Sequence, residues 1–162
     1  MAVTSRRTML FTIGALAALA LASGYALLSN NPGAEAAQIF TENDLAIRGY
    51  DPVAYFEEGA PVPGDEAFTT EWQGATWRFA SAANRDAFEA DPERYAPQYG
   101  GYCAWAVAAK GELYSTQPQN WTIVDDKLYL NYNDDVQATW EKDIPGYIAE
   151  GDRRWPEIAG ES

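Results

Sequence analysis

The clearest alternation of hydrophobic and polar residues lies near the middle of the chain, where it predicts a β-hairpin. In Thr76–Phe79, apolar and polar side chains alternate, as in a strand that buries one face. Phe68–Trp72 precedes it, and Gln73-Gly74 between the two runs favours a tight turn because it contains glycine. We therefore expect two paired strands, with Phe68 and Trp72 on the buried face.

A second hairpin is predicted nearer the C-terminus. Trp121–Val124 and Lys127–Asn131 are apolar-rich runs, and Asp125-Asp126 between them is a turn-forming pair. The short distance between the runs predicts that they pair antiparallel.

Capping residues predict two short helices directly after the first hairpin. Ser81 is a favoured N-cap residue, and the helix that follows it extends to Phe88–Ala90, with Ala83 on the same side as Phe88. Asp91-Pro92 then begins a shorter helix that ends near Tyr95, because proline suits the first helical position.

The C-terminal part of the chain is also predicted to be helical. Asn133 is an N-cap for a helix to Lys142, with acidic residues in its first turn and a basic residue in its last, as the helix dipole favours. Asp143-Ile144-Pro145 begins another helix, in which apolar residues recur at helical spacing up to Trp155. Pro156 is expected to end it.

Two shorter helical segments complete the pattern. Asp51-Pro52 opens a helical turn over Val53–Phe56, and Gly100-Gly101 permits a sharp bend before a short helix that carries Cys103 and stops at Lys110-Gly111. The whole pattern predicts an α+β fold, a small single domain of two β-hairpins packed by short helices, with helices at its C-terminus.

Residues 1–37 are predicted to be an export signal, which leaves residues 38–162 as the domain. Arg6 and Arg7 precede an uncharged apolar run and resemble a twin-arginine signal, and Ala34 and Ala36 form a small-x-small cleavage site. The alternative is that the run, about 20 residues long, stays uncleaved as a membrane anchor. Either way we expect the domain to be periplasmic or otherwise exported, with membrane contact only through this segment.

A series of short motifs follows in order along the chain. They are G-Y-D-P-V-A-Y-F at 49–56, F-A-S at 79–81, Phe88, Asp91-Pro92, Tyr95, Y-G-G-Y-C-A at 99–104 and L-Y-L-N-Y-N at 128–133. Over residues 40–157 this series resembles a YHS domain, a small module related to the TRASH-type metal-binding domains. The resemblance is to an exported bacterial branch, and many members of that branch have no assigned activity.

The chain departs from the metal-binding members of that family at three positions. Those members carry cysteines in a D-P-V-C start and in an F-C-S-x-x-C core, whereas Ala54, Ala80 and Asn84 stand at the corresponding positions here. The resemblance therefore carries over scaffold residues and not ligands: Asp51, Pro52, Phe79 and Phe88.

Composition narrows the chemistry of the domain. With 24 acidic and 11 basic residues, a net charge of −13, the surface repels phosphate backbones, which excludes nucleic acid as a partner. The chain has no histidine and one cysteine, and both methionines, Met1 and Met9, lie in the export signal. An ordinary zinc, copper or iron–sulfur site needs several such ligands, so we expect no cofactor. A weak metal site that uses Cys103, from one protomer or from two, stays open as an alternative.

Cys103 has three interpretations. It is a buried packing thiol, a reactive or metal-ligating thiol at a helix start, or the link of a disulfide-bonded homodimer. Its neighbours Tyr99, Tyr102 and Trp105 either line a pocket for a small ligand or form the edge of the core. We favour packing for the thiol, because aromatic and small residues flank it.

Three functions follow. The first is a non-enzymatic exported domain that binds an unidentified small ligand or protein, or acts as an accessory module. The second, suggested by the resemblance, is periplasmic metal handling through Cys103. The third is a Cys-dependent enzyme or redox protein, which the absence of histidine disfavours because histidine is the usual base for a cysteine nucleophile.

Overall fold

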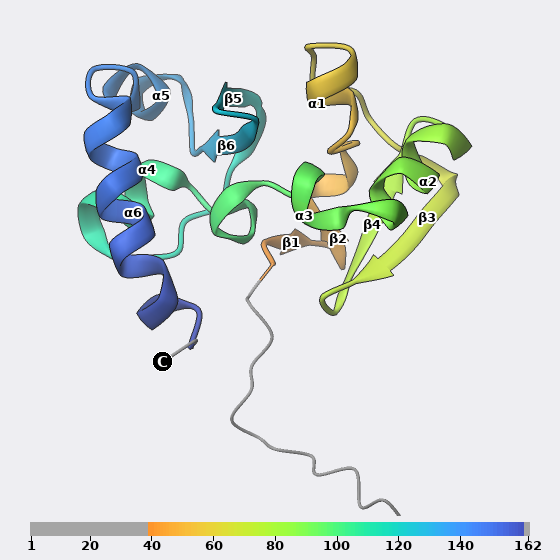
Figure 1. The fold of residues 1–162 in the computed structure, drawn as a ribbon, viewed down its shortest axis with the longest axis horizontal. Coiled ribbons are helices and arrows are strands. Elements are labelled where there is room, and N and C mark those ends of the chain that lie inside the picture. The colour runs from red at the N-terminus through yellow and green to blue at the C-terminus, as the bar shows by residue number, and fades with distance from the viewer. Residues whose placement is uncertain (1–38, 161–162) are drawn as a thin grey trace, which may run out of the picture. The chain divides into compact units, whose positions relative to one another are not determined.

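Both predicted hairpins are present in the computed structural model, which describes residues 39–160 (Figure 1). Strand β3 (Asp65–Trp72) pairs antiparallel with β4 (Ala75–Phe79), and β5 (Gln117–Val124) pairs antiparallel with β6 (Lys127–Asn131). β3 and β5 begin earlier than predicted, because a register shift interrupts each pairing and with it the alternation of side chains.

Each hairpin turns through two residues in the left-handed conformation. The φ angles are 49° at Gln73 and 73° at Gly74, and 50° at Asp125 and 58° at Asp126. A two-residue type I′ turn requires positive φ at both central positions. Gln73 in one turn and Lys127 directly after the other both line the pocket described below.

The first hairpin belongs to a larger sheet than the sequence predicts. Two short strands, β1 (Thr41–Glu42) and β2 (Leu45–Ala46), extend it to a four-stranded mixed sheet in the order β1-β2-β4-β3. Strand β2 runs parallel to β4 and antiparallel to β1. Strands of two residues are too short to show an alternation, so the sequence pattern does not indicate them.

The predicted helices are also present, and two of the predicted caps are formed. Ser81 Oγ accepts a hydrogen bond from the backbone N–H of Asn84 at 3.1 Å, and Asn133 Oδ1 accepts one from Val136 at 2.9 Å. The helices are α1 (Ala54–Glu57), α2 (Ala82–Ala90), α3 (Pro92–Tyr95), α4 (Ala104–Lys110), α5 (Asp134–Trp140) and α6 (Ile144–Ile158), with 3₁₀ segments η1 (Ile47–Gly49) and η2 (Gln98–Gly101).

The expectation that Pro156 ends the last helix is wrong. Helix α6 continues to Ile158, and the backbone N–H of Ala159 donates to the carbonyl of Trp155 at 2.8 Å, beyond the proline. Trp155 and Ile158 both pack against the hydrophobic core, which favours the helical conformation through this turn.

Two smaller expectations also need correction. Helix α5 ends at Trp140 and does not reach Lys142, because Asp143 begins the next helix and adopts an extended φ of −154°. Ala83 is exposed, and the half-buried neighbour Asn84 faces inward in its place.

The core consists of two hydrophobic clusters that meet at strand β6. Leu128 and Leu130 belong to a cluster that includes Phe88 of α2, whereas Tyr129 belongs to a cluster with Trp140 of α5. Successive side chains of a strand point to opposite sides, so a strand with all three buried lies between two apolar layers. Helices α4 and α6 pack against each other in the second cluster (Figure 1). The described residues form the expected α+β single domain.

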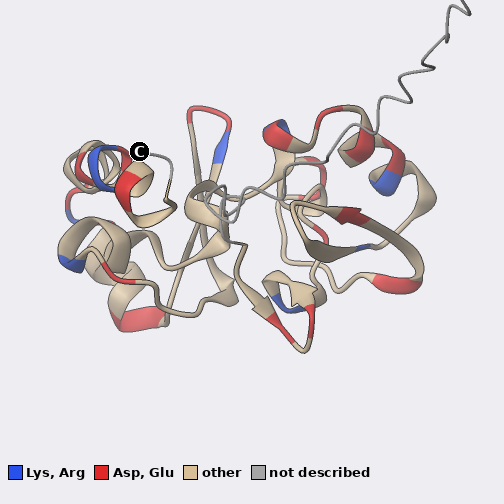
Figure 2. Ribbon diagram, turned by 90° about the horizontal axis from the view of Figure 1, so that it is seen from below, with Lys and Arg blue, Asp and Glu red and all other residues tan. Residues whose placement is uncertain are grey.

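Acidic residues are distributed along the whole ribbon rather than gathered in one segment (Figure 2). Between Ile39 and Gly160, no helix has both the length and the hydropathy that a membrane span requires. Arg6, Arg7, Ala34 and Ala36, the residues of the predicted export signal and its cleavage site, lie outside the described residues.

Candidate functional site

Asp51 is fully buried, and its carboxylate connects two segments by hydrogen bonds: the start of α1 and the beginning of α2. Its Oδ1 accepts hydrogen bonds from the backbone N–H groups of Val53 at 2.8 Å and Ala54 at 3.3 Å. Its Oδ2 accepts from the N–H of Ala80 at 2.8 Å and from the side-chain amide of Asn84 at 2.7 Å. Four donors satisfy this carboxylate, which is what a buried charge requires.

The sequence resemblance identified three positions at which metal-binding members of the family carry cysteine. In the structure these positions lie together around Asp51. Ala54, Ala80 and Asn84 each donate a hydrogen bond to Asp51, two through the backbone and one through the side chain. In this chain the three positions surround a buried carboxylate as hydrogen-bond donors. Within residues 39–160, no group of three or more His, Cys, Asp or Glu side chains is placed to hold a metal ion.

Cys103 is fully buried directly before helix α4. Its thiol lies 3.6 Å from Asn131 Oδ1, which also accepts a 3.1 Å hydrogen bond from the backbone N–H of Trp105. Burial raises the pKa of the Cys103 thiol above its ordinary value, and nearby backbone N–H groups offset this only in part. A buried thiol that keeps its proton is a weak nucleophile and a poor metal ligand, so its position favours the packing interpretation.

Of the four residues predicted to surround a pocket near Cys103, only Tyr99 lines the pocket described below. Tyr102 packs against Phe40, with ring centroids 5.6 Å apart, and the half-buried Trp105 ring lies 5.5 Å from the ammonium of Lys110. Tyr99 lines a pocket, but Tyr102, Cys103 and Trp105 are not among the residues that line it.

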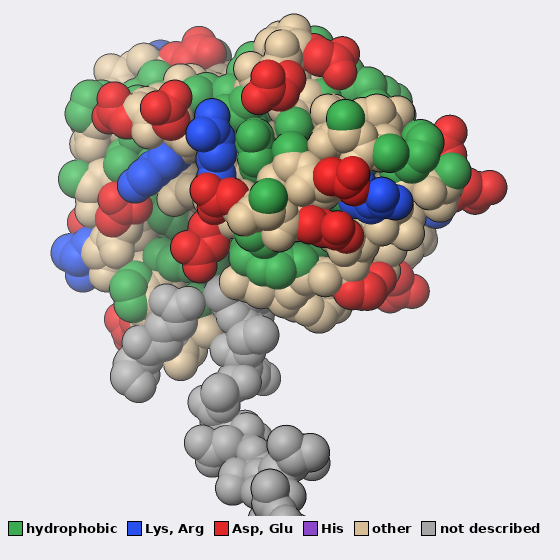
Figure 3. Space-filling model, turned by 45° about the vertical axis from the view of Figure 1, so that its right-hand side comes forward, with side chains coloured by type: hydrophobic (Ala, Val, Ile, Leu, Met, Phe, Trp, Pro, Cys, Tyr) green, Lys and Arg blue, Asp and Glu red, His purple; other side chains and the backbone are tan. Residues whose placement is uncertain are grey.

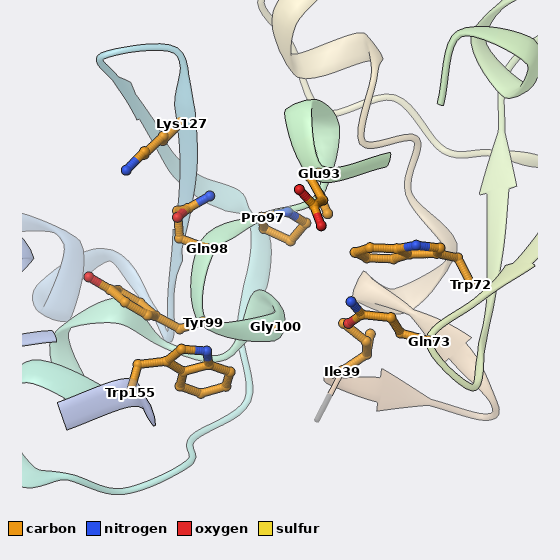
Figure 4. A pocket seen from close by; sticks show the side chains of 11 residues that line it. Ile39, Trp72, Gln73, Glu93, Pro97, Gln98, Tyr99, Gly100, Lys127 and Trp155 are labelled. Atoms are coloured by element: carbon orange, nitrogen blue, oxygen red, sulfur yellow. The ribbon is translucent and has the colours of Figure 1, made fainter. Parts of the chain in front are cut away.

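This pocket has a volume of about 320 Å³ and lies where several elements meet (Figure 4). Trp72 and Trp155 stand on opposite sides of it, with Gly100 between them. The lining comes from the residues before β1, the end of the β3–β4 hairpin, the segment from α3 to η2, the tip of the β5–β6 hairpin and α6: Ile39, Trp72, Gln73, Glu93, Ala96, Pro97, Gln98, Tyr99, Gly100, Lys127 and Trp155.

Tyr99 is held firmly in the wall of the pocket. Its hydroxyl donates a 2.9 Å hydrogen bond to Asp152 Oδ1 of α6, and its ring lies 5.7 Å from Trp155 and 5.8 Å from Tyr129. Burial, and then the hydrogen bond to Asp152, raises the pKa of Tyr99, so the hydroxyl remains a donor. Residue 151 is glycine, and a Cβ there would lie 2.5 Å from the Tyr99 hydroxyl.

Trp72 is fixed from behind by the first hydrophobic cluster. Its ring lies edge-on to Phe88 at 5.7 Å and 5.8 Å from Trp77, whose indole N–H donates to the Trp72 carbonyl at 3.2 Å. Trp72 and Trp155 are both half-buried, so each indole packs on the core and still leaves surface for the pocket. Rigid aromatic walls of this kind are typical of ligand pockets.

Opposite charges stand at the rim. Glu93 and Lys127 are both exposed, and neither takes part in the ion pairs found among residues 39–160. Their formal charges cancel, so the pocket itself has no net charge. The amides of Gln73 and Gln98 add groups that both donate and accept hydrogen bonds.

The sequence predicts that Tyr99 lies either at a pocket beside Cys103 or at the edge of the core, and it does not indicate Trp72 or Trp155 as pocket residues. Trp72 was assigned only to the buried face of a hairpin, and Trp155 only to an apolar helix stripe. The one available signal for Trp72 is its position directly before a turn, where a large indole at a strand end cannot be completely covered.

A family model for the YHS domain matches residues 53–99. The chain contains a YHS domain. The match begins two residues after Asp51, includes Ala54, Ala80 and Asn84, and ends at Tyr99 in the wall of the pocket. No curated protein and no solved structure matches the chain.

The YHS domain supplies most, but not all, of the pocket. Trp72, Glu93 and the Ala96–Tyr99 segment lie within the matched residues, whereas Lys127 and Trp155 come from the C-terminal part of the chain. Cys103 also lies beyond the matched residues. The pocket is therefore built jointly by the YHS domain, by Ile39 before it and by the segments that follow it.

Proposed function

We propose that this chain is a non-enzymatic binding domain that holds a small ligand in the pocket between Trp72 and Trp155. The observation that carries the proposal is the pair of half-buried indoles on opposite sides of the pocket, each supported by a separate hydrophobic cluster. The volume of about 320 Å³ lies at the lower end of the range of small-molecule sites.

The interior of the pocket supports binding rather than catalysis. Its floor contains the buried residues Pro97 and Gly100, which bear no reactive side-chain groups, and Tyr99 is already committed as a donor to Asp152. The charged groups Glu93 and Lys127 are exposed at the rim, where water weakens their effect on bound molecules.

Metal handling through Cys103 has less support. The thiol is fully buried, its nearest polar partner is an amide oxygen, and alanine or asparagine replaces the three cysteines of the metal-binding relatives. A Cys-dependent reaction has the same difficulty, because the sulfur lacks both access and a base. Elemental analysis that found one metal ion per chain, lost in Cys103→Ser, would favour the metal function over ours.

We further propose that the domain acts outside the cytoplasm, on the strength of the twin-arginine motif at Arg6 and Arg7. Replacement of both by lysine should stop translocation and leave precursor in the cytoplasm, which fractionation and immunoblotting would measure. Unchanged export of this variant would contradict a twin-arginine route.

Native mass spectrometry of protein purified from its own compartment tests the binding function. We expect a bound small molecule on the wild-type protein, lost in Trp155→Ala. Trp105→Ala is the matched control, because it removes a half-buried indole that does not line the pocket. Equal retention by Trp155→Ala would overturn the proposal, and so would the absence of any bound species if no added small molecule binds in a Trp155-dependent manner either.

A further inference from the structure

We infer that the pocket between Trp72 and Trp155 binds a neutral saccharide, with a sugar ring lying against an indole. This inference rests on the proposed binding function and names the chemical class of its ligand. It follows from the walls of the pocket, the charges at its rim and the polar groups between them.

The walls favour a ligand with a flat, weakly apolar face. Trp72 and Trp155 stand on either side of the pocket in Figure 4, and Pro97 adds a further apolar surface. A pyranose ring presents axial C–H groups on its faces and hydroxyls around its edge. The C–H face can pack on an aromatic ring while the hydroxyls stay directed outward to polar groups.

The rim favours a ligand without net charge. Glu93 and Lys127 carry opposite charges. An anion in the pocket is therefore repelled by Glu93, and a cation is repelled by Lys127. The whole chain has a net charge of −13, and Figure 3 shows acidic side chains spread over the face that it draws, with hydrophobic ones exposed between them. This field further disfavours phosphates and acidic sugars.

The remaining lining groups match hydroxyls. Gln73 and Gln98 each offer a carbonyl oxygen and an NH₂ group, Glu93 accepts hydrogen bonds, and Lys127 donates them. Sugar hydroxyls both donate and accept, so they can pair with every one of these groups. A purely apolar ligand would cover some of them without offering a hydrogen bond, which lowers affinity.

Isothermal titration and tryptophan fluorescence with defined probes test the inference. The neutral probes are glucose, galactose, N-acetylglucosamine and their oligomers, and the competing classes are galacturonic acid, choline and indole. We expect saturable binding of at least one neutral saccharide. Trp155→Ala should weaken it about fivefold, since an aromatic contact of this kind contributes roughly 1 kcal/mol.

Two further variants keep the test independent of folding. Gln98→Ala removes one amide from a half-buried position and should also weaken saccharide binding, whereas Trp105→Ala, outside the pocket, should leave it unchanged. Circular dichroism and urea unfolding of each variant would show that the domain is folded. Saccharide binding by Trp155→Ala and Gln98→Ala that is as strong as binding by the wild-type protein would overturn the inference.

The outcomes separate the ligand class from the binding function. If choline, indole or galacturonic acid binds in the Trp155-dependent manner and the neutral saccharides do not, the saccharide class is wrong and the binding function stands. If no probe binds but native mass spectrometry finds a Trp155-dependent ligand, the binding function stands and the saccharide class is again wrong. If neither experiment finds a ligand, both proposals fail.

Discussion

The side-chain amide of Asn84 donates a 2.7 Å hydrogen bond to Asp51 Oδ2 and so connects helix α2 to the segment before α1. Asp51 is completely buried, and this contact is its one bond from a side chain, the others coming from backbone N–H groups. Asn84 thus stabilises the fold by holding a buried carboxylate in place.

Replacement of Asn84 by alanine should destabilise the domain. It removes a donor from a buried carboxylate, and hydrogen bonds to charged groups contribute about 1.5–3 kcal/mol to the free energy of unfolding. Urea unfolding followed by circular dichroism would measure the loss. Arg85→Ala on the same helix is the control, because its ion pair with Asp86 is exposed to solvent and should contribute little to stability. Equal stability of Asn84→Ala and wild type would show that the contact is dispensable.

Cys103 should behave as a packing residue. Cys103→Ala and Cys103→Ser should each cost about 1–3 kcal/mol of unfolding free energy, through a small cavity or a buried hydroxyl. Because burial raises the pKa of the thiol, a thiol reagent should modify the native protein slowly at pH 7 and rapidly only in denaturant. Rapid modification of the folded protein would instead support a ligand or nucleophile.

Alkaline pH should destabilise the domain through its buried tyrosines. Burial raises the pKa of Tyr129 to about 12 in the folded protein, whereas the pKa of a tyrosine in the unfolded chain is about 10. Above that pH the unfolded state binds fewer protons than the folded state, so the free energy of unfolding falls as pH rises, by at most about 1.4 kcal/mol per pH unit for each such residue.

The Tyr129→Phe variant tests this pH dependence. Its unfolding free energy should fall less steeply than that of the wild type between pH 10 and 12, since one buried hydroxyl is gone. Urea titrations at a series of pH values would give both slopes. Identical slopes would mean that Tyr129 ionises as readily in the folded protein as in the unfolded chain.

Gly151→Ala should destabilise helix α6 although alanine is the better helix former. The new Cβ would lie 2.5 Å from the Tyr99 hydroxyl, and overpacking of this kind costs about 1–3 kcal/mol. Helix propensity alone predicts that Gly151→Ala raises the free energy of unfolding by about 1 kcal/mol. The control is the reverse substitution at an exposed position of the same helix: Ala149→Gly should lower the free energy of unfolding by a similar amount. A thermal melt distinguishes the two signs. Stabilisation by Gly151→Ala would show that Tyr99 can move aside.

Much of the fold follows from local patterns in the sequence. The alternation in Thr76–Phe79 places Trp77 and Phe79 in the core, and Ser81 and Asn133 cap their helices as expected. These features depend on residues close together in the chain, which is why sequence reasoning finds them. The two-residue strands β1 and β2 depend on distant pairing and were missed.

The pocket could be predicted only in part for the same reason. Tyr99 is grouped with Cys103 in the sequence because the two are close in the chain, and of that group only Tyr99 lines this pocket. Trp72 and Trp155 are 83 positions apart, and only the packing of the hairpin and of α6 brings them to one cavity. Hydrophobic periodicity reports that a residue is buried, but not which distant residue it faces.

The position of β6 between the two hydrophobic clusters has a consequence for how the domain unfolds. Leu128 and Leu130 stabilise one cluster and Tyr129 the other, so separation of the strand from either side exposes apolar surface on both. A partly open form that keeps one cluster intact is therefore costly. Unfolding should be all-or-none, and the backbone amide protons of residues 128–130 should exchange with solvent only when the whole domain opens.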